Sequence, residues 1–352
     1  MWKYGGRSWR IMWRCRNCER GRRGYSTSHG GVAAVWGNGD YGRLGMAGSL
    51  DSQWTPHILP SSSFHHLPLT SISCGGAHTL FLTNTGRVYA TGLNDFGQLG
   101  ISHNIPYSME PCEVSGLQKE VGQISAGYHH SCAITVDGEM YMWGRNSNGQ
   151  LGLGKKAEKA INLPTKVECL NGIAIKKVAL ASEHSVAVTG GGEALSWGSD
   201  SFGQLGHGLE SSFLGLFKST NEYTPRRIKQ LEGVKVKNVA AGMLHSAFID
   251  ENGSVFMFGK GLGFGEHGSM TTSSMIGKLP SSKEVSCGGY HTCVVTSNSI
   301  DALHFPERVQ GPFVKSPVDQ ISCGWKHTAA ISCNNFSNTV LHVHMQFRWF
   351  PH

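Results

Sequence analysis

Short stretches of alternating apolar and polar residues, separated by turns that contain Gly and Asn, follow one another along most of this chain. Stretches such as RVYATG and EMYMWG lie just after turn contexts such as NTG and VDG. Alternation with a period of two is typical of half-buried strands, and Gly and Asn tolerate positive φ at hairpin turns. The turn glycines are Gly86, Gly138, Gly192 and Gly253. The pattern predicts short antiparallel strands, with no sustained helical spacing after the first 25 residues.

One phrase recurs six times: Gly or Ala three places before a His, with Ser or Thr directly after the His. The six histidines are His78, His130, His184, His245, His291 and His327. The first four lie 14 residues before a glycine that opens a Gly-rich run such as GSDSFGQLG. These marker glycines are Gly92, Gly144, Gly198 and Gly259. A period of about 50 residues indicates repeated supersecondary units that must be stacked to bury their apolar faces.

The repeat predicts an all-β protein built as a β-propeller. A unit of four short strands cannot cover both of its faces, and radial repetition lets neighbouring sheets cover each other. A linear β-solenoid is the competing arrangement, but its coils would be shorter than this repeat.

The phrases around the histidines and the G-x-N/D-x-x-G-Q-L-G runs resemble the regulator of chromosome condensation repeat family. GRNSNGQLG from Gly144 and GNGDYGRLG from Gly37 are close to that family's pattern, and the resemblance covers residues 31–331. It implies a nominally seven-bladed propeller, of which about five to six units are recognisable. In this family the N-terminal strand, here around Trp36, typically completes the last blade.

The C-terminal part departs from the pattern, so the chain resembles a shortened form of the family's propeller. From Ser299 the chain reaches Pro306 in seven residues, without the strand and the Gly-rich run that the earlier units place there. Residues 332–352 match nothing in the repeat and are expected to form a separate tail.

Residues 1–28 form a segment of different character. They hold eight Lys and Arg residues and a single Glu, and the remainder of the chain has 23 basic and 23 acidic residues. Trp2, Trp9, Met12 and Trp13 can share one helical face opposite Arg7, Arg10 and Arg14, which is typical of a mitochondrial presequence. Arg23 lies three residues before an expected cleavage between Tyr25 and Ser26. A chloroplast address and a disordered basic tail are the alternatives.

The histidines, Gly-rich runs and cysteines could suggest metal binding, phosphate binding or catalysis, but their pattern fits structural roles better. One motif histidine per unit cannot converge on one ion, and a buried His beside a hydroxyl is expected to satisfy backbone groups. The Gly-rich runs lack the GKS or GKT ending of phosphate loops. Five cysteines occupy apolar positions of the repeat and are expected to fill the core: Cys74, Cys132, Cys287, Cys293 and Cys323. We predict no catalytic, cofactor-binding or metal-ligating residues, and no membrane span.

A longer interval between His184 and His245 contains a loop with Phe213, Leu214 and Phe217 among polar residues. Such a cluster suits a partner surface, and packing of the loop on its own blade is the equal alternative. Trp325 is similar to a tryptophan of the family's light sensor, but the equivalent positions of the other units lack tryptophan.

What the resemblance implies about function is a non-enzymatic scaffold of the mitochondrial matrix. Mitochondrial members of the family support organellar gene expression, in RNA maturation and intron splicing and in ribosome or respiratory complex I biogenesis. The implied partners are splicing or ribosome-assembly proteins, with RNA contacted indirectly. The alternative is a guanine-nucleotide exchange factor for a small GTPase.

Overall fold

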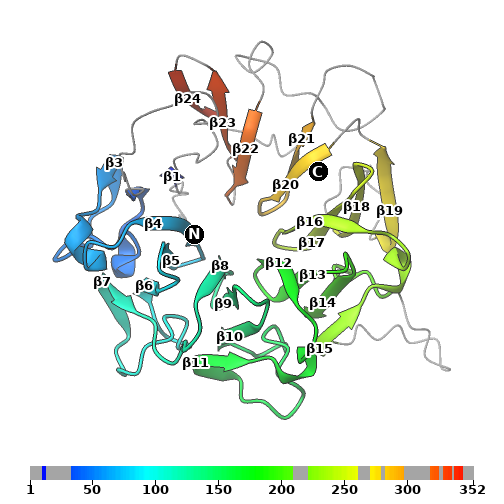
Figure 1. The fold of residues 1–352 in the computed structure, drawn as a ribbon, viewed down its shortest axis with the longest axis horizontal. Coiled ribbons are helices and arrows are strands. Elements are labelled where there is room, and N and C mark those ends of the chain that lie inside the picture. The colour runs from blue at the N-terminus through cyan, green and yellow to red at the C-terminus, as the bar shows by residue number, and fades with distance from the viewer. Residues whose placement is uncertain are drawn as a thin grey trace, which may run out of the picture.

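The computed structural model describes residues 10–12, 33–208, 221–260, 270–278, 282–296, 318–324, 328–334 and 337–343. Within these ranges the chain forms antiparallel sheets that lie around a common axis, as Figure 1 shows. Regular helix is confined to 3₁₀ turns in the described ranges, and no helix there is long and apolar enough to cross a membrane. The arrangement confirms the predicted all-β propeller.

Four sheets are complete and share the sequential strand order of a propeller blade. The first contains β4 (Leu69–Cys74), β5 (His78–Thr83), β6 (Val88–Leu93) and β7 (Tyr107–Glu113). The second contains β8 (Val121–Ala126), β9 (His130–Thr135), β10 (Met140–Arg145) and β11 (Ala160–Lys166). The third contains β12 (Ile175–Leu180), β13 (His184–Thr189), β14 (Ala194–Gly198) and β15 (Glu222–Arg227). The fourth contains β16 (Val236–Ala241), β17 (His245–Asp250), β18 (Ser254–Gly259) and β19 (Met270–Lys278).

Three further sheets have fewer strands in the described ranges. One pairs β1 (Arg10–Met12), β2 (Ala34–Gly37) and β3 (Gln53–Ile58), and another pairs β20 (Ser282–Cys287) with β21 (Thr292–Thr296). The last sheet contains β22 (Val318–Cys323), β23 (Thr328–Asn334) and β24 (Ser337–Val343). The two-stranded sheet contains the repeat unit that the sequence shows to be short.

The two ends of the chain differ from expectation. Trp36 lies on β2, which pairs with β1 and β3, whereas the family pattern places this strand in the last blade. Residues 10–12, expected on a helix, form strand β1, because the edge of β2 offers unpaired backbone groups. Residues 337–343, expected in a separate tail, form β24 beside β23.

The hairpin turns follow from the predicted glycines. The backbone angle φ lies between +75° and +89° at Gly86, Gly138, Gly192 and Gly253. Residues other than glycine rarely adopt this conformation. Each of these glycines joins the second and third strands of a complete sheet. The turn chemistry that the sequence predicts is therefore confirmed.

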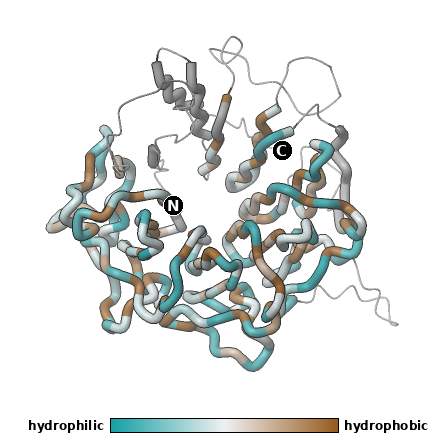
Figure 2. Tube along the Cα trace, in the orientation of Figure 1, coloured by the Kyte–Doolittle hydropathy of each residue, from teal (hydrophilic) through white to brown (hydrophobic). Residues whose placement is uncertain are grey.

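The core is divided into clusters between neighbouring sheets. Leu80, Leu99, Ile124 and Trp143 belong to one cluster, which joins the first complete sheet to the second. A second cluster joins the second and third sheets through residues such as Met142, Leu151 and Trp197. Figure 2 shows apolar residues in every sheet rather than in one central mass. Each sheet is thus stabilised mainly by its neighbours.

Candidate functional site

The motif histidines form a ladder of hydrogen bonds that passes from each sheet to the next. For each of the five motif histidines in the described ranges, Nε2 lies 2.8–3.1 Å from the hydroxyl oxygen of the residue that follows the next motif histidine. The pairs are His78–Ser131, His130–Ser185, His184–Ser246, His245–Thr292 and His291–Thr328. The histidines therefore join consecutive repeat units.

The serine hydroxyl in the first three pairs donates to a carbonyl of a Gly-rich run, and this second bond decides the histidine tautomer. Ser131 donates to the Gln98 carbonyl at 2.8 Å and Ser185 to the Gln150 carbonyl at 2.8 Å. Because the single hydroxyl proton is used there, the serine oxygen accepts from the histidine Nε2–H. His130 accordingly carries a proton on Nε2.

Burial keeps these imidazoles neutral. Burial lowers the pKa of His78, His130 and His184 to about 3 and that of His245 to about 4. The Nδ1 atoms of His78 and His130 have no hydrogen-bond partner in the described part of the chain, so a proton there would have no acceptor. The structural role predicted for the histidines agrees with this geometry, but their partners are side-chain hydroxyls and not the expected backbone groups.

The Gly-rich runs are turns in which side-chain oxygens accept hydrogen bonds from backbone amides of the same run. The Asn94 side-chain oxygen accepts from the Leu99 amide, and the Gln98 side-chain oxygen accepts from the Phe96 amide. Asn146 and Gln150 repeat these two bonds one unit later. These two amides of each run are therefore paired inside the turn.

The same turns receive the tryptophan of the next sheet. The Trp143 Nε1–H donates to the Gln98 carbonyl at 2.9 Å, and the Trp197 Nε1–H donates to the Gln150 carbonyl at 2.8 Å. A Cβ added to Gly100 would lie 2.7 Å from Trp143 Nε1. The glycines of the run therefore permit the close approach between blades that the sequence predicts.

At the strand ends that carry the Gly-rich runs, the propeller presents pairs of aromatic and cationic side chains. We call this surface the loop face. The Arg145 guanidinium lies 5.4 Å from the Phe96 ring centre, and Lys260 lies 5.5 Å from the Phe202 ring centre. Arg43, which is buried, lies 5.5 Å from the ring centre of the exposed Tyr41. Arg145 and Lys260 each directly follow a marker glycine, and each reaches back to the run of the preceding sheet. Cations over aromatic rings within about 6 Å attract each other.

His129 links this arrangement to a further aromatic residue. Its ring packs edge-on against Tyr128 at 4.6 Å and against Phe96 at 5.1 Å between ring centres. Burial, and then the charge of Arg145, lowers the pKa of His129. Tyr128 is 43% exposed, and Tyr290 on a later loop is 46% exposed. The loop face thus combines aromatic rings, cations and a neutral imidazole.

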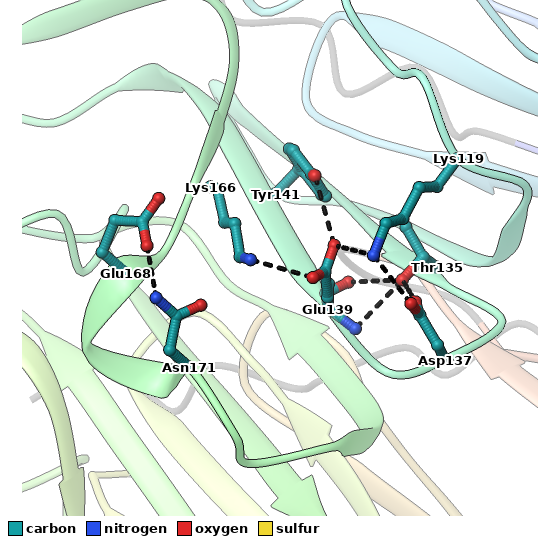
Figure 3. Close-up of polar contacts among 8 residues, drawn as sticks. All are labelled: Lys119, Thr135, Asp137, Glu139, Tyr141, Lys166, Glu168 and Asn171. Atoms are coloured by element: carbon teal, nitrogen blue, oxygen red, sulfur yellow. Dashed lines mark hydrogen bonds and ion pairs between the residues drawn. The ribbon is translucent and has the colours of Figure 1, made fainter.

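The opposite end of the second complete sheet contains a network of ion pairs, shown in Figure 3. Lys119 Nζ lies 2.8 Å from both Asp137 and Glu139, and Lys166 Nζ lies 2.8 Å from Glu139. The hydrogen bonds of Lys119 and Thr135 lower the pKa of Asp137 to about 2. The side chains of these ion pairs are 26–51% exposed, so the network orders the surface without forming a chemical site.

The cysteines only partly follow the prediction that they fill the core. Cys132 and Cys287 are buried, and burial raises the pKa of Cys287 to about 12. Cys74 is exposed, so the core role predicted for it is wrong. Cys293 and Cys323 are half-buried, and with His291 they form a group whose ligand atoms all lie within 4.8 Å of one another. The sequence analysis did not single out this group.

Several predicted residues lie outside the described residues. They are His327, Trp325, Phe213, Leu214, Phe217, Arg7, Arg14 and Arg23, and only the backbone of Arg10 is described, on β1. The loop face was missed at the level of sequence. The cation after the marker glycine and the Phe within the preceding run were the available signal.

Comparison with known proteins agrees with this geometry. The profile of the RCC1-like domain matches residues 25–213, and that of the regulator of chromosome condensation (RCC1) repeat matches residues 191–249. The ultraviolet-B receptor UVR8 of Arabidopsis thaliana is 31% identical over 87% of this chain and 72% of its own length. RUG3 of Arabidopsis thaliana, a mitochondrial RCC1 domain-containing protein, is 32% identical over 68% of this chain and 52% of its own length.

Other relatives are much longer than the shared propeller. The probable E3 ubiquitin-protein ligase HERC4 of Rattus norvegicus is 32% identical over 75% of this chain, but the match spans only 29% of the ligase. Among solved structures, human WBSCR16 superposes with a TM-score of 0.70 at 24% identity, covering 86% of this chain and 81% of that chain. Yeast RCC1 (Prp20), solved in complex with Kap60, gives 0.67 at 21% identity, covering 84% of this chain and 76% of that chain. These two likenesses concern the fold.

Proposed function

Because the chain belongs to the RCC1-like propeller family, we propose that it is a non-enzymatic mitochondrial scaffold that supports organellar gene expression by holding protein partners on its loop face. The observation that carries the proposal is the set of aromatic–cation pairs on that face, Arg145 with Phe96 and Lys260 with Phe202, together with the exposed ring of Tyr128. Aromatic residues and Arg are the side chains that contribute most to protein–protein binding.

The balance of charge favours a protein partner over direct binding of RNA. Outside residues 1–28 the chain has 23 basic and 23 acidic residues. Proteins that bind nucleic acid through phosphates concentrate Lys and Arg to release counterions. Basic and acidic residues are balanced in this propeller, so it lacks the excess of positive charge that would bind RNA phosphates. RNA is therefore contacted through a bound protein.

The mitochondrial location rests on the Arg-rich, acid-poor start of the chain and on the likeness to RUG3, whose name places that protein in mitochondria. RNA maturation with intron splicing, and ribosome or respiratory complex I biogenesis, are the processes we assign to the scaffold. The loop with Phe213, Leu214 and Phe217 stays a predicted second contact for the same partners.

The mechanism follows from how the propeller holds its loops. The runs from Gly92 and Gly144 are each tied to the next sheet by a serine hydroxyl and a tryptophan Nε1–H, so these loop ends are rigid before a partner arrives. A preordered surface loses little conformational entropy on binding. The scaffold acts by keeping two partners on neighbouring loops at a constant separation.

The test uses cells that lack this gene and re-express the full chain or variants of it. We expect wild type to restore the ratio of mature to precursor mitochondrial transcripts and the profile of ribosomal particles, and a Tyr128→Ala/Arg145→Ala variant to fail at equal abundance. Lys119→Ala, on the opposite end of the sheet, is the matched control and should restore both. Normal transcripts and particles in the cells without the gene would contradict the proposal.

The exchange-factor alternative has its own readout. Release of fluorescent GDP from mitochondrial and Ran-like small GTPases is measured with catalytic amounts of the purified chain. Acceleration that Tyr128→Ala/Arg145→Ala abolishes would assign the loop face to a GTPase. No acceleration, together with failed transcript maturation in the cells, supports the scaffold.

A further inference from the structure

The junction between the last two sheets differs chemically from every earlier junction. In each unit the residue two places after the motif histidine packs against the residue four places before the next motif histidine. The earlier pairs lie together within hydrophobic clusters: Leu80 with Ala126, Cys132 with Leu180, Val186 with Ala241 and Ala247 with Cys287. At the last junction both positions are cysteine, Cys293 on β21 and Cys323 on β22.

The two thiols share one hydroxyl. Thr328 Oγ1 lies 3.5 Å from Cys293 Sγ and 3.4 Å from Cys323 Sγ, and it lies 2.9 Å from His291 Nε2. The two sulfurs are within 4.8 Å of each other, so the S–S bond of about 2.05 Å requires them to move by less than about 3 Å. Both cysteines are half-buried and accessible to a small reagent.

The environment also distinguishes the two sulfurs. The hydrogen bond with Cys323, together with that of Thr328, lowers the pKa of Cys293, whereas the same contact and burial raise the pKa of Cys323. A thiolate at neutral pH is the nucleophile in thiol–disulfide exchange. By contrast, burial raises the pKa of Cys132 and Cys287, which places those thiols in a non-reactive state.

We propose that Cys293 and Cys323 form a redox-active dithiol that reacts with small disulfides such as glutathione disulfide and reversibly links the last two sheets. The Cys293 thiolate attacks one sulfur of the small disulfide, forms a mixed disulfide and expels one thiolate. The Cys323 thiol loses its proton and attacks the Cys293 sulfur, which expels the second thiolate. The protein loses two electrons and two protons, and the small disulfide becomes two thiols.

A metal ion fits the same group less well. His291 Nε2 already bonds the Thr328 hydroxyl, as every described motif histidine bonds its own partner, and that hydroxyl lies within 3.5 Å of all three candidate ligand atoms. A metal ion would have to displace it. The cross-link only requires the sulfurs to approach each other across the junction.

The cross-link would act where the fold is weakest. β20 and β21 form a two-stranded sheet in the described ranges, and such a sheet buries little surface of its own. A bond between β21 and β22 encloses about 30 residues and restricts the unfolded chain. We therefore expect the oxidised protein to be the more stable form.

The test equilibrates the purified full chain in glutathione buffers of graded potential, with a chelator present, and quantifies the Cys293–Cys323 peptide by mass spectrometry. We expect a reversible two-electron transition and a melting temperature about 5 °C higher after oxidation. Cys323→Ala should instead retain glutathione on Cys293, because the thiol that resolves the mixed disulfide is absent, and Cys293→Ala should likewise form no cross-link. Both variants place at these positions a residue that equivalent positions already carry, Ala126 and Ala247, so they should fold.

Two results would overturn the proposal. One is the absence of the cross-linked peptide at high glutathione disulfide while both single variants are folded. The other is protection of both thiols that disappears only when the chelator is added, which would assign the group to a metal ion. Loss of transcript maturation in the cells without the gene, with no cross-link, would leave the scaffold proposal standing and remove this one.

Discussion

His130 Nε2 on β9 lies 3.1 Å from Ser185 Oγ on β13, in the neighbouring sheet, and the same hydroxyl donates to the Gln150 carbonyl. Both side chains are completely buried. The Ser185 hydroxyl of the third complete sheet therefore bonds two groups of the preceding unit, the His130 imidazole and the Gln150 carbonyl. The bond is the unit by which consecutive repeats are joined.

Replacing Ser185 with Ala should lower the free energy of unfolding by about 2–4 kcal/mol, because it leaves the His130 Nε2–H and one acceptor position of the Gln150 carbonyl unsatisfied in the core. Urea denaturation of the purified chain measures the change. Ser62→Ala, at an exposed position, is the matched control and should change stability by less than about 0.5 kcal/mol. Equal loss in both variants would contradict the role of the ladder.

Stability should fall steeply as the pH decreases below about 6.5. The unfolded chain binds protons on its histidines with a pKa near 6.5, whereas the folded chain does not protonate His78, His130 and His184 until about pH 3. The stability contributed by the neutral imidazoles is present above pH 6.5 and is lost between 6.5 and 3. At pH 5.5 the expected loss is roughly 1.4 kcal/mol for each histidine. Denaturation curves at pH 7.5 and 5.5 that coincide would exclude buried neutral histidines.

Asp200 occupies the position of Asn94 and Asn146 in its own Gly-rich run, where its side-chain oxygen accepts from the Leu205 amide at 2.9 Å. Burial raises the pKa of Asp200 to about 6, so its carboxylate destabilises the fold above that pH. Asp200→Asn should therefore stabilise the protein by about 1–2 kcal/mol at pH 7.5 and by much less at pH 4.

The reverse substitution provides the control for Asp200. Asn146→Asp should destabilise the protein at pH 7.5, since it introduces the same buried charge into the equivalent turn. Thermal melts at the two pH values separate the two variants. A pH-independent effect of Asp200→Asn would show that the carboxylate is not the cause.

Gly144→Val should lower the melting temperature by several degrees. Gly144 has a φ of +103°, and a Cβ there would lie 2.6 Å from the His129 carbonyl oxygen and 2.7 Å from His130 Cα. Gly116→Ala is the control that measures the cost of backbone strain alone. The φ of Gly116 is +80°, and a Cβ there would meet nothing within 4 Å. The valine variant should lose considerably more than the alanine control. Melting of both with the parent protein would contradict the assigned geometry of the marker turn.

The mitochondrial address is tested separately from the fold. Changing Arg7, Arg10 and Arg14 to Glu should abolish import of a reporter fused to residues 1–28, because the positive charge of an amphipathic presequence is reversed. Import into isolated mitochondria and protection from added protease provide the measurement. Lys155→Glu/Lys156→Glu in the full chain, far from the segment, should leave import unchanged. Retained import of the Arg variant would remove the presequence interpretation.

Interactions between units account for most of what the sequence analysis missed. The structural role of His130 could be predicted, but its partner Ser185 lies 55 residues away on another sheet. The Arg145–Phe96 pair likewise joins two repeat units: each residue has a recognisable place in its own unit, but the sequence does not show that the two meet. At Cys74 the apolar position of the repeat predicted burial, and the exposed position appears only once the neighbouring elements are in place.

The repeat itself was readable because its determinants are local. Gly86 and Gly138 specify hairpin turns through φ, alternation specifies the strands, and the marker glycines specify the start of each Gly-rich run. Tertiary structure decided which hydroxyl each histidine meets, which strand pairs with β2, and that Cys293 faces Cys323. These depend on how one sheet is placed against the next, and that placement comes from burial summed over whole blades and not from the conformational preference of any short segment.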